Sequence, residues 1–97
     1  MIPYSFHPEA EAELEDASLF YESRMRGLGK SFAAEVERAI ALIREYPDAG
    51  SPAALPRRRV LVARFPYSVV YRRDPDAIVI VAVAHQRRRP SYWRRRT

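Results

Sequence analysis

One segment near the carboxyl terminus constrains the fold of this chain more than any other. Residues 77–84 read Ala-Ile-Val-Ile-Val-Ala-Val-Ala and are apolar at every position. An uninterrupted run of this length, rich in β-branched residues, is typical of a strand that is covered on both faces. The turn residues Asp74-Pro75-Asp76 precede it, and His85 follows it. The sequence therefore predicts a central strand over residues 77–85 with other structure on both of its sides.

Three further strands are expected around this one. Residues 60–63 and 67–72 are separated by a Phe-Pro break, and they alternate in the manner of strands. Together with residues 77–85 they form a three-strand meander. Residues 2–6 are a short apolar and aromatic run that ends before Pro8. This run predicts a first strand at the amino terminus.

Two helices are expected between the first strand and the meander. Pro8 suits the first turn of a helix, and the apolar positions that follow recur every three or four residues until a glycine pair interrupts them near Arg26. Ser31 is expected to cap or begin a second helix that ends at Tyr46. The short linker predicts an antiparallel pair. Residues 47–56 hold three prolines and one glycine, and we expect them to form an irregular connection.

The predicted order of elements is β-α-α-β-β-β, which places the chain in the α+β class. Two helices that follow one another and precede a meander are expected to pack on one face of a mostly antiparallel, four-stranded sheet. The 97 residues suffice for one hydrophobic core. We therefore expect a single domain over residues 1–97, with residues 86–97 as a basic and aromatic tail.

The charges of the two halves of the chain differ strongly. Residues 1–50 hold ten acidic and five basic side chains, and residues 51–97 hold two acidic and twelve basic ones, so the net charges are −5 and +10. The basic half is where a polyanion or an acidic protein would be attracted. The chain has no cysteine, which excludes disulfides, thiol catalysis and thiolate metal sites. It shows neither a signal peptide nor a long apolar run, so we expect a cytoplasmic protein that does not enter a membrane.

The candidate functional residues in the basic half are arginines, aromatic residues and one histidine. Arg57, Arg58 and Arg59 open a strand, where they either protect a sheet edge by charge or grip phosphate groups. Alternation sends Arg57 and Arg59 to one face and Arg58 to the other. His85 ends the central strand and has a pKa range suited to proton transfer. Arg64 is expected near the same end of the sheet as His85.

The tail combines six arginines with a phenol and an indole. Guanidinium groups that alternate with aromatic rings bind phosphates and stack on bases. Tyr92 offers a proton donor or acceptor beside these cations, and the indole of Trp93 is expected to find either packing or a ligand. No metal site is expected, because the two histidines are isolated in the sequence. No pair of carboxylates in the basic half supports a hydrolase of the kind that needs two.

The sequence resembles the RelE/ParE superfamily of toxins. The resemblance is carried by residues 64–72 and 81–93, and by the sequences Phe20-Tyr21-Glu22 and Gly27-Leu28-Gly29 in the helical part. It implies a toxin of a type II toxin-antitoxin system with the RelE-like fold. RelE-like members cut messenger RNA on the ribosome without a metal, whereas ParE-like members poison DNA gyrase without nuclease residues. The resemblance implies no cofactor.

Carried onto this chain, the nuclease branch implies the catalytic residues His85, Tyr92, Arg64 and Arg88. His85 would transfer a proton, the arginines would hold the phosphate, and Tyr92 matches the tyrosine near the carboxyl terminus of that branch. The residues expected to bind nucleic acid are Arg57, Arg58, Arg59, Arg87, Arg89 and Trp93. Ser68 departs from the pattern, because RelE-like nucleases often have an arginine at this position.

The sequence therefore leaves three functions open. The first expectation is a ribosome-dependent endonuclease that cuts messenger RNA and arrests translation. The second is an inhibitor of DNA gyrase that binds without catalysis, and the third is a binding module whose basic face serves only its antitoxin. In each case the expected partner is a cognate antitoxin with an acidic toxin-binding segment, in a heterotetramer or a larger complex.

Overall fold

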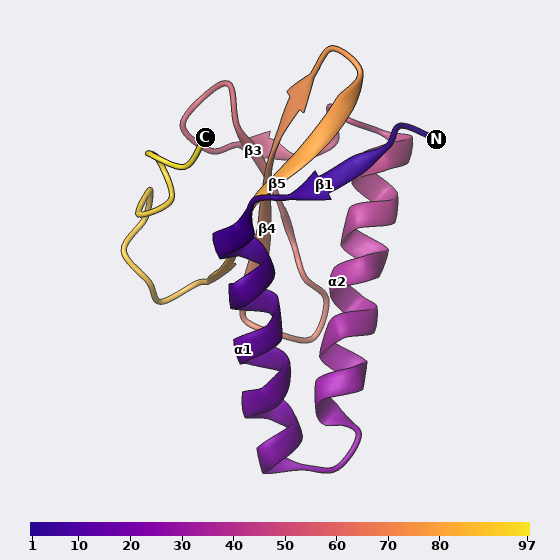
Figure 1. Cartoon of the computed structure of the whole chain (residues 1–97), viewed down its shortest axis with the longest axis vertical. Coiled ribbons are helices and arrows are strands. Elements are labelled where there is room, and N and C mark those ends of the chain that lie inside the picture. Colours follow the sequence, from indigo (N-terminus) through magenta and orange to yellow (C-terminus); the bar gives the residue numbers. More distant parts are fainter.

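The computed structural model describes residues 1–97 and contains one mixed sheet with the strand order β1-β5-β4-β3-β2. Strands β3, β4 and β5 form the expected antiparallel meander, and β1 pairs in parallel with the first part of β5. The α+β prediction is confirmed (Figure 1). The strands are β1 Tyr4–Phe6, β2 Ser51–Pro52, β3 Arg58–Leu61, β4 Tyr67–Asp74 and β5 Ala77–His85.

The prediction of four strands was wrong, because the connection before β3 contributes a fifth. Ser51 and Pro52 form the short edge strand β2 and pair with Arg59 and Arg58. Two residues are too few to show the alternation by which a strand is recognised in a sequence. Proline also lacks the N–H of an inner strand, so it is tolerated here only because β2 is at the edge.

The helices are α1, Pro8–Arg24, and α2, Leu28–Glu45. Helix α1 begins at Pro8 as predicted, and the His7 side chain caps it by accepting a hydrogen bond from the N–H of Glu9. Helix α2 begins three residues before the predicted Ser31. The reason is the carboxylate of Glu22, which accepts hydrogen bonds from the N–H groups of Gly27 and Gly29 at 2.9 and 3.0 Å. This side chain from α1 does the capping that we had expected of Ser31.

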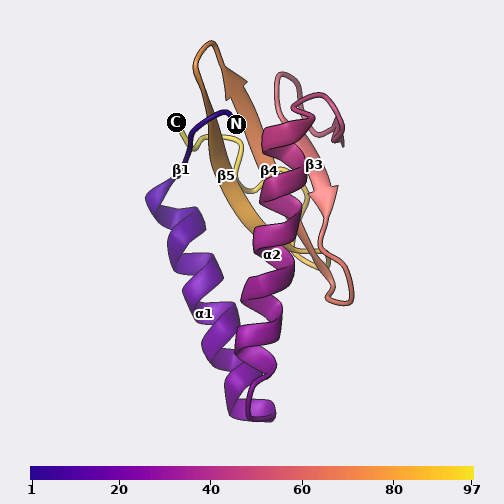
Figure 2. The same cartoon turned by 90° about the vertical axis from the view of Figure 1, so that its right-hand side faces the viewer.

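The two helices lie antiparallel on one face of the sheet, as Figures 1 and 2 show. We call this the inner face. Its core is apolar, because the buried stripe of α2 meets the side chains of β4 and β5 that point toward the helices. The core includes Ala10, Ala17, Phe32, Val36, Ile40, Ile43, Val69, Tyr71, Ile78, Ile80 and Val83. Neither helix is long and apolar enough to cross a membrane.

A β-bulge lets β5 serve two cores. Val70 pairs with Ala82 and Tyr71 pairs with Ile80, so Val81 is an extra residue on β5. A bulge shifts the alternation of the strand by one residue. Before the bulge, Ile78 and Ile80 of β5 belong to the inner core. At and after the bulge, Val81, Ala82 and Ala84 belong to a second cluster on the opposite, outer face. The predicted burial of this strand on both faces is therefore confirmed.

Candidate functional site

The tail, residues 86–97, crosses the outer face of the sheet. It contains turns but no helix or strand. Trp93 is only 6% exposed and packs with Val70, Val81, Ala82 and Ala84. Of the two roles expected for its indole, packing or a ligand, the structure shows packing. Figure 2 shows the tail behind the sheet, on the side away from the helices.

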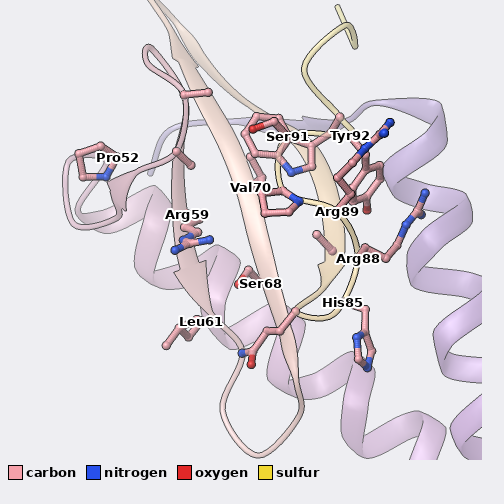
Figure 3. Close-up of a pocket in the computed structure, with 16 residues that line it drawn as sticks. Pro52, Arg59, Leu61, Ser68, Val70, His85, Arg88, Arg89, Ser91 and Tyr92 are labelled. Carbon is pink, nitrogen blue, oxygen red and sulfur yellow. The ribbon is translucent and has the colours of Figure 1, made fainter.

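A pocket of about 510 Å³ lies between the tail and the outer face. Its lining includes the buried apolar residues Val70 and Ala84, and Arg59, Arg88 and Arg89 also line it. Figure 3 shows Arg59 on the β3 side of the pocket and Arg88 and Tyr92 on the tail side. The candidate residues that line this pocket are Arg59, His85, Arg88, Arg89, Tyr92 and Trp93.

The remaining candidates lie outside the pocket. Arg64 has a left-handed backbone with φ of 70° in the turn between β3 and β4, and its guanidinium is 3.6 Å from the carboxylate of Glu35 on α2. Arg57 lies over the Trp93 ring and donates to the carbonyl of Arg94. These contacts give Arg57 and Arg64 structural partners within the chain. Arg87 also does not line the pocket.

Arg57, which precedes β3, and Arg58 and Arg59 of β3 follow the predicted alternation. Arg59 lines the outer pocket, and Arg57 contacts the tail on the same side. Arg58 is opposite Tyr71 of the inner core in the pairing of β3 with β4, and it donates to the carbonyl of Gly50. Only Arg59 of the three therefore presents a guanidinium group to the pocket.

His85 ends β5 opposite Tyr67, and the two rings are in edge contact with centroids 5.0 Å apart. Its Nδ1 accepts a hydrogen bond from the N–H of Arg87 at 3.0 Å. In the neutral imidazole one nitrogen accepts and the other carries the proton. This contact therefore favours the tautomer with hydrogen on Nε2, so that the neutral ring has a donor rather than a base to offer toward solvent.

Tyr92 is fastened to the first helix. Its hydroxyl donates a hydrogen bond of 2.6 Å to Oε2 of Glu13, and the Arg88 guanidinium lies 3.6 Å from the centre of its ring. Burial, together with the hydrogen bond to Glu13, raises the pKa of Tyr92 above its ordinary value. The phenol is accordingly protonated at neutral pH, and its proton is directed at a carboxylate of the same chain.

Glu13 is the central polar residue of this region, and our sequence reasoning missed it. Its carboxylate accepts two hydrogen bonds from Arg96, at 2.8 and 2.9 Å, in addition to the one from Tyr92. It also accepts from the N–H of Val83 on β5 at 3.0 Å, and Arg88 is 3.5 Å away. These contacts raise the pKa of Arg96, chiefly through its hydrogen bonds to Glu13.

A signal for Glu13 was present in the helical periodicity. It stands three residues after the buried Ala10 and four before the buried Ala17, so it lies on the apolar stripe of α1. A charged residue on such a stripe needs a partner in the folded protein. Acidic residues in the first turn of a helix favour its dipole, which explains Glu9 and Glu11 but not Glu13.

Comparison with known proteins now gives the class of protein that has this fold. The chain resembles a solved structure described as a chromosomal ParDE TA system from P. aeruginosa, with a TM-score of 0.75 and 19% sequence identity. The match covers 88% of this chain and 96% of the other. At this identity the likeness establishes the shared fold. A search among curated proteins finds no match.

The sequence comparison establishes the family. Residues 4–90 match the family described as ParE toxin of type II toxin-antitoxin system, parDE, and the chain belongs to this family. It is therefore the toxin of a type II toxin-antitoxin system, and a cognate antitoxin is its partner. The predicted membership of the RelE/ParE superfamily is confirmed. The matched segment ends before Tyr92, Trp93 and Arg96.

Proposed function

We propose that this toxin inhibits DNA gyrase by binding to it, and that it catalyses no reaction of its own. Membership of the ParE family supports this function, since ParE-like toxins act on gyrase. The observation that carries the choice against a nuclease is the 2.6 Å hydrogen bond from the Tyr92 hydroxyl to Glu13. It commits the tail tyrosine, the residue that most resembles the nuclease branch, to a contact inside the protein.

Two other nuclease candidates, His85 and Arg64, also have partners within the chain. Cleavage of RNA through the ribose 2′-OH needs a base, cations at the phosphate and an acid for the leaving oxygen. Nδ1 of His85 already accepts a hydrogen bond from the backbone, and Arg64 is beside Glu35. These contacts favour a function in binding over a function in which the residues transfer protons.

The outer side of the molecule offers a surface for such binding. Five of its arginines, Arg59, Arg87, Arg89, Arg94 and Arg95, make no ion pair with an acidic side chain of the chain. Arginine side chains without internal partners raise the local positive potential and attract acidic proteins and nucleic acids. The DNA that gyrase holds is one polyanion that this side of the toxin would attract.

The test compares two targets of the purified toxin. We expect it to block supercoiling by gyrase, to accumulate cleaved DNA, and to leave translation in a cell-free system unchanged. In cells the matching result is an SOS response that precedes any fall in protein synthesis. Arrest of translation with intact DNA and active gyrase would exclude the proposed function.

A ribosome-dependent endonuclease is the second candidate, and one observation favours it. His85, Arg88 and Tyr92 line the same pocket, together with Ser68. The endonuclease function predicts that His85→Ala and Tyr92→Phe each abolish growth arrest while binding of the antitoxin persists. Toxicity that survives both substitutions contradicts it, because the remaining side chains supply neither the base nor the acid.

We also propose that the antitoxin binds the basic half through an acidic segment. Residues 51–97 carry a net charge of +10, which would steer such a segment to the outer face. Affinity that falls as salt rises from low to physiological concentration is the expected result. An affinity that is indifferent to salt would contradict electrostatic steering as the main contribution.

A further inference from the structure

The tail has few backbone contacts with the rest of the protein. The N–H of Gln86 donates to the carbonyl of Pro66, and each later backbone hydrogen bond of the tail joins two residues within the range 85–97. Such turns shape the tail without attaching it to the sheet. Its attachment must therefore come from side chains: the buried Trp93, the hydrogen bond from Arg57 to the carbonyl of Arg94, and the contacts with Glu13.

The contacts with Glu13 join three parts of the fold. Three tail side chains, Arg88, Tyr92 and Arg96, converge on one carboxylate. The same carboxylate accepts the N–H of Val83, so it is also attached to the sheet. The side chains of Arg96 and Glu13 are only 10% and 15% exposed. A paired, hydrogen-bonded arginine and carboxylate shielded from water make one of the stronger polar contacts in proteins.

We infer that Glu13 is the positioning residue of the outer-face site: it fastens the tail, and the pocket and its arginines face the target only while the tail is fastened. The inference rests on the proposed function. Seven of the sixteen residues that line the pocket, Gln86 and the residues from Arg88 to Trp93, belong to the tail. Release of the tail therefore removes one wall of the pocket and disperses the arginines 88, 89, 94 and 95.

The test uses Trp93, the one tryptophan of the chain, as a reporter of the tail. Glu13→Gln keeps the shape of the side chain and removes the charge that pairs with Arg96. Glu15→Gln on the exposed side of the same helix is the matched control. Arg96→Gln breaks the same contact from the tail and leaves α1 unchanged. Acrylamide quenching of Trp93 measures release, and far-ultraviolet circular dichroism measures retention of the fold.

We expect Glu13→Gln and Arg96→Gln to increase quenching of Trp93, to move its emission to longer wavelength and to keep the circular dichroism spectrum. Both variants should also weaken inhibition of gyrase by about tenfold or more, as the loss of an interface anchor does. Glu15→Gln should behave as the unaltered toxin in both assays. Trypsin should cut after the tail arginines faster in the two released variants.

Two results would overturn the inference. The first is Trp93 quenching in both variants equal to that of the unaltered toxin, because Glu13 would then not fasten the tail. The second is a released tail with undiminished inhibition of gyrase, because the fastened tail would then not position the target-binding face. If the unaltered toxin fails to inhibit gyrase, the proposed function is wrong, and the quenching experiment still decides whether Glu13 holds the tail.

Discussion

The two faces of the sheet are covered in different ways. The inner face is covered by two helices, and its core contains large side chains such as Phe32 and Ile43 that are fully buried. The outer face is covered by an irregular tail that is held chiefly by side-chain contacts, among them the Trp93 indole and the Glu13 carboxylate. The difference indicates that the inner face provides the stability of the fold, whereas the outer face can open while the rest stays folded.

The largest expected effect is on the free energy of unfolding, and it should differ between the inner and the outer core. Phe32 is fully buried and its ring is in contact with those of Tyr21, Phe65 and Tyr67. Phe32→Ala should lower the free energy of unfolding by about 4 kcal/mol, because it leaves a cavity among packed rings. Trp93→Ala should lower it by much less, since the tail can detach. Urea unfolding followed by circular dichroism measures both, and equal losses would show that the two faces unfold as one unit.

A smaller loss of stability is expected on removing the hydrogen bonds of the Tyr71 hydroxyl. The buried hydroxyl of Tyr71 donates to the carbonyl of Pro47 at 2.7 Å and accepts from the N–H of Gly50 at 3.0 Å. Tyr71→Phe should lower the free energy of unfolding by about 2 kcal/mol, because two backbone groups lose their partner. Tyr46→Phe, at a side chain that is 57% exposed, is the control. No loss in the first variant would mean that water replaces the hydroxyl.

The smallest expected effect is that the attachment of the tail to the outer face weakens at alkaline pH. The pKa of Tyr92 is raised by burial and by its bond to Glu13. Below the ordinary tyrosine pKa of about 10 both the fastened and the released tail carry the phenol proton, so the fastening is at full strength. Above that pH only the released tail loses the proton, and the fastening weakens as pH rises toward the raised pKa.

This prediction is measured by acrylamide quenching of Trp93 between neutral pH and the alkaline limit of the fold. Quenching should begin to rise near the ordinary tyrosine pKa. Tyr92→Phe should remove that rise, because phenylalanine has no proton to lose. A rise that is identical in the variant would assign the transition to another group.

Much of the inner half could be predicted from the sequence, because local patterns determine it. The apolar run of β5 gave the bounds Ala77–His85 that the structure has. Pro8 marked the first residue of α1. The start of α2 was misplaced since its cap, Glu22, comes from the preceding helix. The strand β2 left no pattern in two residues.

The outer half depends on contacts between distant residues. The resemblance to the nuclease branch grouped His85, Arg88 and Tyr92, and these three residues line one pocket. The role of Glu13 could not be predicted from the sequence, because 79 positions separate it from Tyr92 and the helix dipole offers a local explanation for its charge. The burial of Trp93 depends on the bulge at Val81, which no single-residue pattern reveals.

The edge of β5 gives the contact with Glu13 a second consequence, which concerns self-association. Strand β1 pairs with β5 only as far as Ile80, so the later part of β5 has no neighbouring strand on that side. An uncovered strand edge is a template on which another chain can add itself. Here the N–H of Val83 is bonded to Glu13 and the carbonyl of Val81 to Arg96. Two side chains thus occupy the hydrogen-bonding groups of a missing strand, and a toxin whose tail is released would be expected to aggregate through this edge.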